Sequence, residues 1–264
     1  MKKSMNILRR SVLMGATALM GMSLAPLAAS ADELSQITER GVLRIAMTGQ
    51  YPPFNFVNEK NEVVGFDPAI GTEIARRMGL ETEIITTAWD GIIGGLIANK
   101  FDAVVGSMSI TEERDKVIDF VGPYYNTKRA FFTVAGSDIT SLDQLNDKDV
   151  TVGLTLGETH DQWARDQGYN VRTYKGLPEL LLELTNGRID VVINDSIPVL
   201  LAMKAGQYDL AEIPAPDAEA FPAGIAIREN NPELAAAMQK ALDEMMEDGT
   251  YMKFANEWVG GDIR

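Results

Sequence analysis

The sequence contains no cysteine among its 264 residues and only one histidine, His160. Disulfides therefore cannot stabilise the fold, although a chain of this length is able to bury hydrophobic cores without them. His160 stands beside Glu158 and Asp161, and this short run offers too few well-spaced ligands for a metal site. We therefore expect neither a metal nor a cofactor, and we interpret His160 as a solvated residue at the start of a helix.

Basic residues are also scarce, and four of them fall within the first ten positions, where no acidic residue occurs. An uncharged, mostly apolar run over 12–27 follows, and Ala29-Ser30-Ala31 offers a cleavage site of small residues. This three-part pattern is typical of a secretory signal peptide, so we expect residues 1–31 to be removed after Ala31. A membrane anchor is the alternative, but the run is short for a span of about 20 strongly apolar residues. No later segment is apolar enough to insert in a membrane, and no cysteine follows for lipid attachment.

The 233 residues after the predicted signal peptide are strongly acidic. They hold 20 of the 24 basic side chains and all 38 acidic ones, which gives a net charge of −18. Such a surface repels nucleic acid and anionic membranes, and we expect neither as a partner.

Short β-rich runs alternate with segments of helical periodicity, which predicts an α/β fold with a mainly parallel sheet. Asp67 and Asp90 are expected to cap helices. The clearest helix begins after Asn231 and ends at Gly249. Connectors between two βα-rich halves are expected near 125–128 and 214–222, the second because Pro214, Pro216 and Pro222 break that stretch. The other predicted strands and helices are, in chain order, strands 42–47, 81–86, 103–106, 130–134, 151–154, 171–174 and 191–194, and helices 66–79, 91–99, 159–168, 177–186, 197–204 and 250–258.

Polar residues follow several of these strands, at the sheet edge where open α/β folds bind ligands. Ser107 and Ser109 stand at one strand end, where a helix is expected to begin and to offer free amides to an anion, and Arg114 lies one turn into that helix as a candidate for a bidentate contact with a carboxylate. A surface arginine paired with a neighbouring acid is the alternative. Thr159 opens a helix after Gly157, and its backbone N–H is a second candidate donor to an anion.

A candidate cation site and two aromatic walls complete this set. Asp195 follows a strongly apolar strand, and its carboxylate suits a ligand ammonium, with helix capping as the alternative. Tyr51 and Trp89 are candidate walls for a ligand side chain, although ordinary packing explains either ring about equally well. Together these groups match the zwitterionic head of an α-amino acid and a slot for its side chain.

The order and spacing of short motifs after the predicted signal peptide resemble the polar amino-acid-binding proteins of ABC importers, solute-binding protein family 3. The resemblance covers nearly all of that part of the chain. The matching stretches are Tyr51-Pro52-Pro53-Phe54, Val64-Gly65-Phe66-Asp67, Trp89-Asp90-Gly91-Ile92-Ile93, Lys100-Phe101-Asp102-Ala103, Ser107 to Arg114, Val117 to Phe120, Tyr124-Tyr125, Gly187-Arg188-Ile189-Asp190 and Asp248 to Tyr251.

This resemblance implies a type II periplasmic binding protein fold, two βα lobes joined by a two-stranded hinge. Lobe 1 would combine residues 32–126 and 220–264, and lobe 2 would hold residues 127–219. The family implies a monomeric periplasmic protein, not an enzyme, that captures a small polar amino acid for the permease of an ABC transporter. Carried over by position, the α-carboxylate would contact Arg114, Ser109 and the Thr159 backbone, the α-ammonium would contact Asp195 and the Ser107 carbonyl, and Tyr51 and Trp89 would enclose the side chain.

Two departures from the family pattern bear on the ligand. Thr48 stands where binders of basic amino acids often carry an acid, whereas Glu158 stands where threonine is common and would either replace that acid or face solvent. The segments around Trp89 and Ser107 look most like those of arginine, ornithine and opine binders, with histidine binders also similar, which favours a basic or amide ligand. The same fold hosts cyclohexadienyl and arogenate dehydratases, so such an enzyme is an alternative, as is a binding component for a chemoreceptor.

Overall fold

The computed structural model describes residues 32–264, and the predicted signal peptide with its cleavage site lies outside the described residues. The described chain forms one mixed sheet in the order β5-β1-β6-β12-β7-β10-β8-β9, with β11 also paired to β7. Its strands are β1 (Val42–Met47), β5 (Glu81–Thr86), β6 (Ala103–Ser109), β7 (Asp119–Val134), β8 (Thr151–Thr155), β9 (Asn170–Tyr174), β10 (Val191–Asp195), β11 (Leu210–Ile213) and β12 (Ala220–Ile227). A small second sheet contains β2 (Gln50–Tyr51), β3 (Asn55–Val57) and β4 (Val63–Val64).

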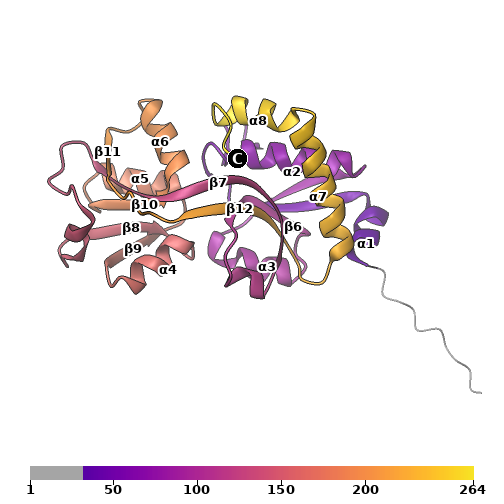
Figure 1. Ribbon diagram of the computed structural model, residues 1–264, viewed down its shortest axis with the longest axis horizontal. Coiled ribbons are helices and arrows are strands. Elements are labelled where there is room, and N and C mark those ends of the chain that lie inside the picture. Colours follow the sequence, from indigo (N-terminus) through magenta and orange to yellow (C-terminus); the bar gives the residue numbers. More distant parts are fainter. Residues whose placement is uncertain (1–31) are drawn as a thin grey trace, which may run out of the picture. The chain divides into compact units, whose positions relative to one another are not determined.

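The strands form two βα lobes, and each lobe has its own helices packed around its strands (Figure 1). In the first lobe, β1, β5 and β6 pair in parallel and lie with α1 (Glu33–Arg40), α2 (Phe66–Arg77), α3 (Ile92–Ile97), α7 (Pro232–Glu247) and α8 (Thr250–Trp258). In the second lobe, β8 pairs in parallel with β9 and β10, and α4 (Thr159–Asp166), α5 (Leu177–Thr185) and α6 (Ser196–Lys204) surround them. The predicted α/β class and the two-lobed arrangement are therefore confirmed.

The long strands β7 and β12 join the two lobes. The first part of β7 pairs with β12 in antiparallel register, and its last part pairs with β10 and β11. The predicted connectors near 125–128 and 214–222 lie where the chain passes between the lobes, with 125–128 inside β7 and the last residues of the second connector, from Ala220, inside β12. Pro222 does not interrupt β12, since it needs no N–H there and its carbonyl accepts from the Ile110 amide at 2.8 Å.

The predicted caps of two helices are wrong. Asp67 lies inside α2, whose N-cap residue is Gly65, and its side chain is fully buried. At Gly65, φ is 130° and an added Cβ would lie 2.3 Å from the Phe54 carbonyl oxygen, so the chain enters α2 in a conformation that only glycine fits. Asp90 lies in a 3₁₀ turn, and neither that turn nor α3 has a side-chain cap hydrogen bond. Asn231 occupies the N-cap position of α7 as expected, but its side chain makes no cap hydrogen bond.

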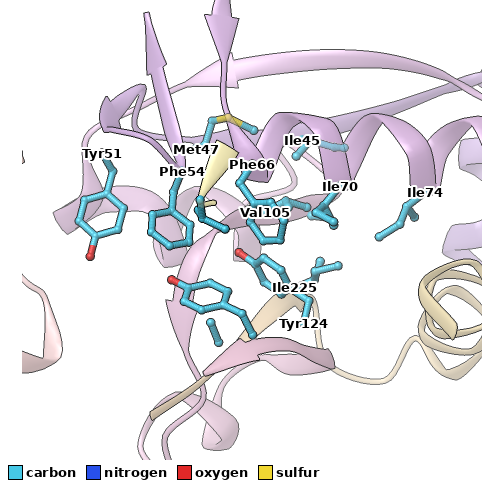
Figure 2. Close-up of a cluster of buried hydrophobic side chains, with 14 of the residues drawn as sticks. Ile45, Met47, Tyr51, Phe54, Phe66, Ile70, Ile74, Val105, Tyr124 and Ile225 are labelled. Carbon is cyan, nitrogen blue, oxygen red and sulfur yellow. The ribbon is translucent and has the colours of Figure 1, made fainter. Parts of the chain in front are cut away.

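Aromatic rings connect the core of the first lobe with the loop after β1. Phe54 stacks on Tyr125 at 4.8 Å between centroids, and Phe66 packs edge-on against Phe54 at 6.0 Å. Tyr51 lies at one end of this cluster, and its hydroxyl points away from the other labelled side chains (Figure 2). The packing of the Tyr51 ring therefore fixes the position of the Tyr51 hydroxyl.

Candidate functional site

All seven predicted site residues line one cavity. It is bordered by strand ends and loops of both lobes, at the carboxyl ends of β1, β6, β8, β9 and β10. The loops that follow β1 and β8 bring polar groups of the two lobes to face the same space. The lining residues are Thr48, Gln50, Tyr51, Trp89, Gly106, Ser107, Ser109, Arg114, Thr155, Glu158, Thr159, His160, Lys175, Gly176 and Asp195.

Arg114 brings a buried positive charge to this cavity. The residue is 9% exposed, its Nη1 donates to the Ser109 carbonyl at 2.9 Å, and its guanidinium lies 5.5 Å from the Trp89 ring centroid. Within residues 32–264, no carboxylate oxygen lies within 4.0 Å of it. Burial lowers the pKa of Arg114, and the negative charges of Glu158 and Asp195 oppose that shift. Because a buried cation is stable only when it is paired, this side chain is suited to receive an anion.

The expected helix around Arg114 is not present. The residue begins a 3₁₀ turn of three residues, Arg114–Lys116, which is too short to offer an N-terminal anion site of its own. Ser109 is the last residue of β6, and its carbonyl fixes the guanidinium. The Arg114 side chain is therefore positioned by its hydrogen bond to the end of β6 and not by a helix.

Asp195 supplies the opposite charge. It ends β10 and is the N-cap residue of α6, yet its side chain makes no cap hydrogen bond, so the helix-capping interpretation is wrong. The Tyr51 hydroxyl lies 2.7 Å from Asp195 Oδ2 and 3.2 Å from Asn194 Oδ1. Tyr51 belongs to the first lobe and Asp195 to the second, so this hydrogen bond crosses the cavity.

The Ser107 hydroxyl is hydrogen-bonded to the buried carboxylate of Asp67. The Ser107 hydroxyl donates to Asp67 Oδ2 at 2.9 Å, and the Tyr124 hydroxyl donates to Oδ1 at 2.7 Å and accepts from the Ser107 amide at 2.8 Å. Ser107 has φ of 60°, which is uncommon for a residue other than glycine. Burial raises the pKa of Asp67 to about 6, although the hydrogen bonds from Tyr124, Asn55 and Ser107 act in the other direction. The network turns the Ser107 side chain toward Asp67.

Thr159 and His160 form the first turn of α4. The Thr159 amide heads this turn, where a helix offers no internal acceptor. His160 is 2% exposed and contacts both Arg129 and Asp195, so the interpretation of this residue as solvated is wrong. Sequence periodicity gave no indication of this, because the side chain is buried by β7 and β10 from distant parts of the chain.

Glu158 is the second carboxyl group on the cavity and is only partly exposed. Burial raises the pKa of Glu158 to about 8, with a further contribution from the negative charge of Asp195, whereas Arg114 acts to lower it. At neutral pH this side chain is therefore mainly protonated, and it borders the cavity as a neutral carboxyl group.

This raised pKa predicts a pH-dependent stability. Between about pH 4.5 and pH 8 the folded protein keeps a proton on Glu158 that the unfolded chain has released, so the free energy of unfolding falls as pH rises through this window. Glu158→Gln removes the effect, and the variant should gain stability relative to the wild type toward pH 8. Urea denaturation at several pH values measures the difference. The exposed Glu257→Gln is the matched control, and parallel curves for wild type and Glu158→Gln would contradict the assignment.

Several lining residues were missed from the sequence. Lys175 and Gly176 directly follow β9, so the rule that ligands bind beyond strand ends would have found them if it had been applied to Tyr174. Gln50 lies beside Tyr51 in β2, and no separate feature of the sequence indicates it. Among residues 32–264, no group of three or more histidine, aspartate or glutamate side chains is placed to hold a metal ion. No helix in this part of the chain is both long and apolar enough to cross a membrane.

Both the sequence and the fold of the chain match known proteins. Residues 43–261 match the family model of bacterial extracellular solute-binding proteins, family 3. The L-cystine-binding protein TcyJ of Escherichia coli (strain K12) is 33% identical over 265 residues, which cover 97% of each chain.

Two solved structures are similar over most of the chain. An ancestral arginine-binding protein bound to arginine has a TM-score of 0.77 and 36% identity, and the match covers 84% of this chain and 99% of that one. The ancestral amino acid-binding protein AncCDT-1, described as a precursor of cyclohexadienyl dehydratase, has a TM-score of 0.80 and 33% identity, with 86% and 99% covered.

Proposed function

Because the chain belongs to family 3 of the bacterial extracellular solute-binding proteins, we propose that it captures a polar α-amino acid in the periplasm and delivers it to the permease of an ABC importer. The observation that carries this proposal is the buried Arg114 guanidinium, which borders the cavity without a carboxylate partner among the described residues, together with the Asp195 carboxylate in the same cavity. An α-amino acid carries the complementary pair of charges on one carbon atom.

The proposed contacts follow from which groups still have capacity to bond. Arg114 would bind the α-carboxylate through a bidentate contact, with support from Ser109 and the Thr159 amide. Asp195 would bind the α-ammonium together with the Ser107 carbonyl, since the Ser107 hydroxyl is already engaged by Asp67.

The side chain of the ligand would lie between Tyr51 and Trp89. Thr48, Gln50, Glu158 and Lys175 border the same cavity, so neutral, acidic and basic groups all surround this slot. Such a lining suits a polar side chain, and we propose a basic or amide amino acid as the preferred class. The relatives named above bind L-cystine and arginine, which are likewise polar.

We further propose that binding closes the two lobes about β7 and β12. Lobe 1 would comprise residues 32–126 and 220–264, and lobe 2 residues 127–219, with the monomer as the working unit. The hydrogen bond between Tyr51 and Asp195 joins the two lobes across the cavity. A ligand that contacts both Arg114 and Asp195 would stabilise only the closed arrangement, because those groups lie on different lobes.

The contact between Gly176 and Gln50 tests this closure. A Cβ at Gly176 would lie 2.6 Å from the Gln50 Cβ and 2.9 Å from its carbonyl oxygen. We expect Gly176→Ala to hold the lobes apart and to weaken ligand binding by about 1–3 kcal/mol, the usual cost of an inserted methyl group. Calorimetric titration measures the loss. Gly94→Ala, where an added Cβ meets nothing within 4 Å, is the control, and unchanged affinity in Gly176→Ala would contradict closure at this contact.

A thermal-shift screen of the purified protein tests the function itself. A ligand that binds the folded state alone raises the melting temperature. We expect a large shift with one small group of polar amino acids, and none with sugars or polyamines. If no amino acid raises the melting temperature, the proposal is wrong.

One observation favours a second candidate function, a dehydratase. Such a reaction needs a general acid to expel a hydroxyl group, and Glu158 borders the cavity with a pKa raised to about 8. The Asp195 carboxylate in the same cavity, by contrast, suits a ligand ammonium and favours the binding protein. Turnover of prephenate or arogenate that is lost in Glu158→Gln would establish the enzyme, whereas an amino-acid complex without turnover supports the binding protein.

A further inference from the structure

His160 borders the cavity and is fixed between two charged side chains. Arg129 Nε donates to His160 Nδ1 at 3.2 Å, and His160 Nε2 lies 3.2 Å from Asp195 Oδ1. Arg129 is held in turn, because its guanidinium lies 4.2 Å from the Trp163 ring centroid and its Nη2 lies 3.5 Å from Glu219 Oε2. These contacts bring together α4, β7 and β10, so the imidazole has little freedom to rotate.

The contact with Arg129 determines which ring nitrogen carries the proton. A guanidinium only donates hydrogen bonds, so Nδ1 must be an unprotonated acceptor. The proton of the neutral imidazole then lies on Nε2 and points at Asp195 Oδ1. A second proton on Nδ1 would face the Arg129 N–H and would add a positive charge beside the guanidinium.

Asp195 depends on this contact for its orientation. Although Asp195 is the N-cap residue of α6, the helix gives its carboxylate no cap hydrogen bond. Oδ1 contacts His160 in the same lobe, and Oδ2 contacts Tyr51 across the cavity. In the opening of the lobes proposed above, the Tyr51 contact would be lost, whereas the contact with His160, which lies in the same lobe as Asp195, would remain.

We propose that His160, with its tautomer set by Arg129, is the positioning residue that holds the Asp195 carboxylate ready for the ligand ammonium. Its effect on binding rests on the proposed function, whereas its tautomer does not. His160 would thereby contribute, through its contact with Asp195, to specificity for ligands that carry an ammonium group.

Nitrogen NMR of the purified protein tests the hydrogen-bonding arrangement directly. The chain has one histidine, so ¹⁵N-histidine labelling gives a single imidazole spectrum. We expect one protonated and one unprotonated ring nitrogen, with the proton on Nε2. A proton on Nδ1, or on both nitrogens, would overturn the proposal whether or not the protein binds amino acids.

Binding by His160 variants tests the consequence. The probe is L-arginine or L-cystine, whichever raises the wild-type melting temperature more, compared with its counterpart without ammonium groups, 5-guanidinopentanoate or 3,3′-dithiodipropionate. We expect His160→Leu to weaken the amino acid about tenfold, the usual effect of losing a hydrogen bond to a charged group, and to leave the counterpart unchanged.

His160→Gln separates positioning from folding, because its amide can accept from Arg129 and donate to Asp195. This variant should retain most of the affinity for the amino acid. Equal losses for the amino acid and its counterpart, or no loss in His160→Leu, would overturn the positioning role. If no amino acid raises the melting temperature of the wild type, the proposed function fails, and the position of the ring proton alone tests the hydrogen-bonding arrangement of His160.

Discussion

Replacing Arg114 by alanine is expected to cost about 2–5 kcal/mol of binding free energy for an α-amino acid, the usual loss when one member of a buried charge pair is removed. The affinity would fall roughly thirtyfold to several thousandfold. The loss is large because the ligand carboxylate would enter a partly dehydrated cavity in which the main positive charge is gone. Isothermal titration calorimetry with the best amino acid from the thermal-shift screen measures the change.

The stability of the same variant adds a second measurement. Arg114 is a buried cation without a carboxylate within 4.0 Å among residues 32–264, so its removal should not lower the melting temperature of the ligand-free protein greatly. Arg76→Ala is the control, since the Arg76 side chain is 68% exposed and pairs with Glu73 on the surface of α2. If Arg114→Ala binds the amino acid as tightly as Arg76→Ala does, the role given to Arg114 is wrong.

Many helices and strands could be predicted because short local sequence patterns indicate them. The buried stripe of α7 repeats at helical spacing, and Gly249 follows its C-terminus, so the sequence indicated this helix within a residue or two. The parallel strands β1, β5 and β8 are short β-rich runs between turns, and each was predicted within one residue.

The strands that join the lobes could not be predicted in the same way. Glycine and proline at 122–123 and proline at 222 favour turns locally, yet both segments are strands because each pairs with the other over a long register. A bulge near Gly224 accommodates the irregularity. Pairing between segments about a hundred residues apart overrides local propensity here, and periodicity within one window contains no information about it.

The same distinction between local and distant contacts applies to the site. The seven predicted site residues lie at or shortly after the carboxyl ends of strands, and all of them line one cavity. His160 was misinterpreted because its environment consists of Arg129 and Asp195, which lie 31 and 35 residues away in the sequence. The burial of Asp67 likewise depends on distant residues, since Tyr124, 57 residues away, is one of its hydrogen-bond donors, and the local sequence indicates only a helix cap there.

Replacing Asp195 by asparagine is expected to weaken the binding of an α-amino acid by about 2–5 kcal/mol and to leave its counterpart without an ammonium group almost unaffected. Asparagine keeps the shape and one acceptor oxygen, so the lost quantity is the negative charge that faces the ammonium. Titration with L-arginine and 5-guanidinopentanoate, or with L-cystine and 3,3′-dithiodipropionate, measures both affinities. Asp166→Asn is the control, because Asp166 is exposed at the end of α4.

The same substitution should also change the titration of Glu158, which separates a direct charge effect from a loss of structure. The negative charge of Asp195 raises the pKa of Glu158, so Asp195→Asn should lower that pKa toward its ordinary value. The pH window in which the free energy of unfolding falls would then end below about pH 8. A variant that loses both compounds equally and keeps the wild-type pH profile would show that Asp195 does not provide the ammonium site. If the variant loses affinity only for the amino acid, and its pH dependence of stability also shifts, then the Asp195 carboxylate acts on both the ligand ammonium and Glu158.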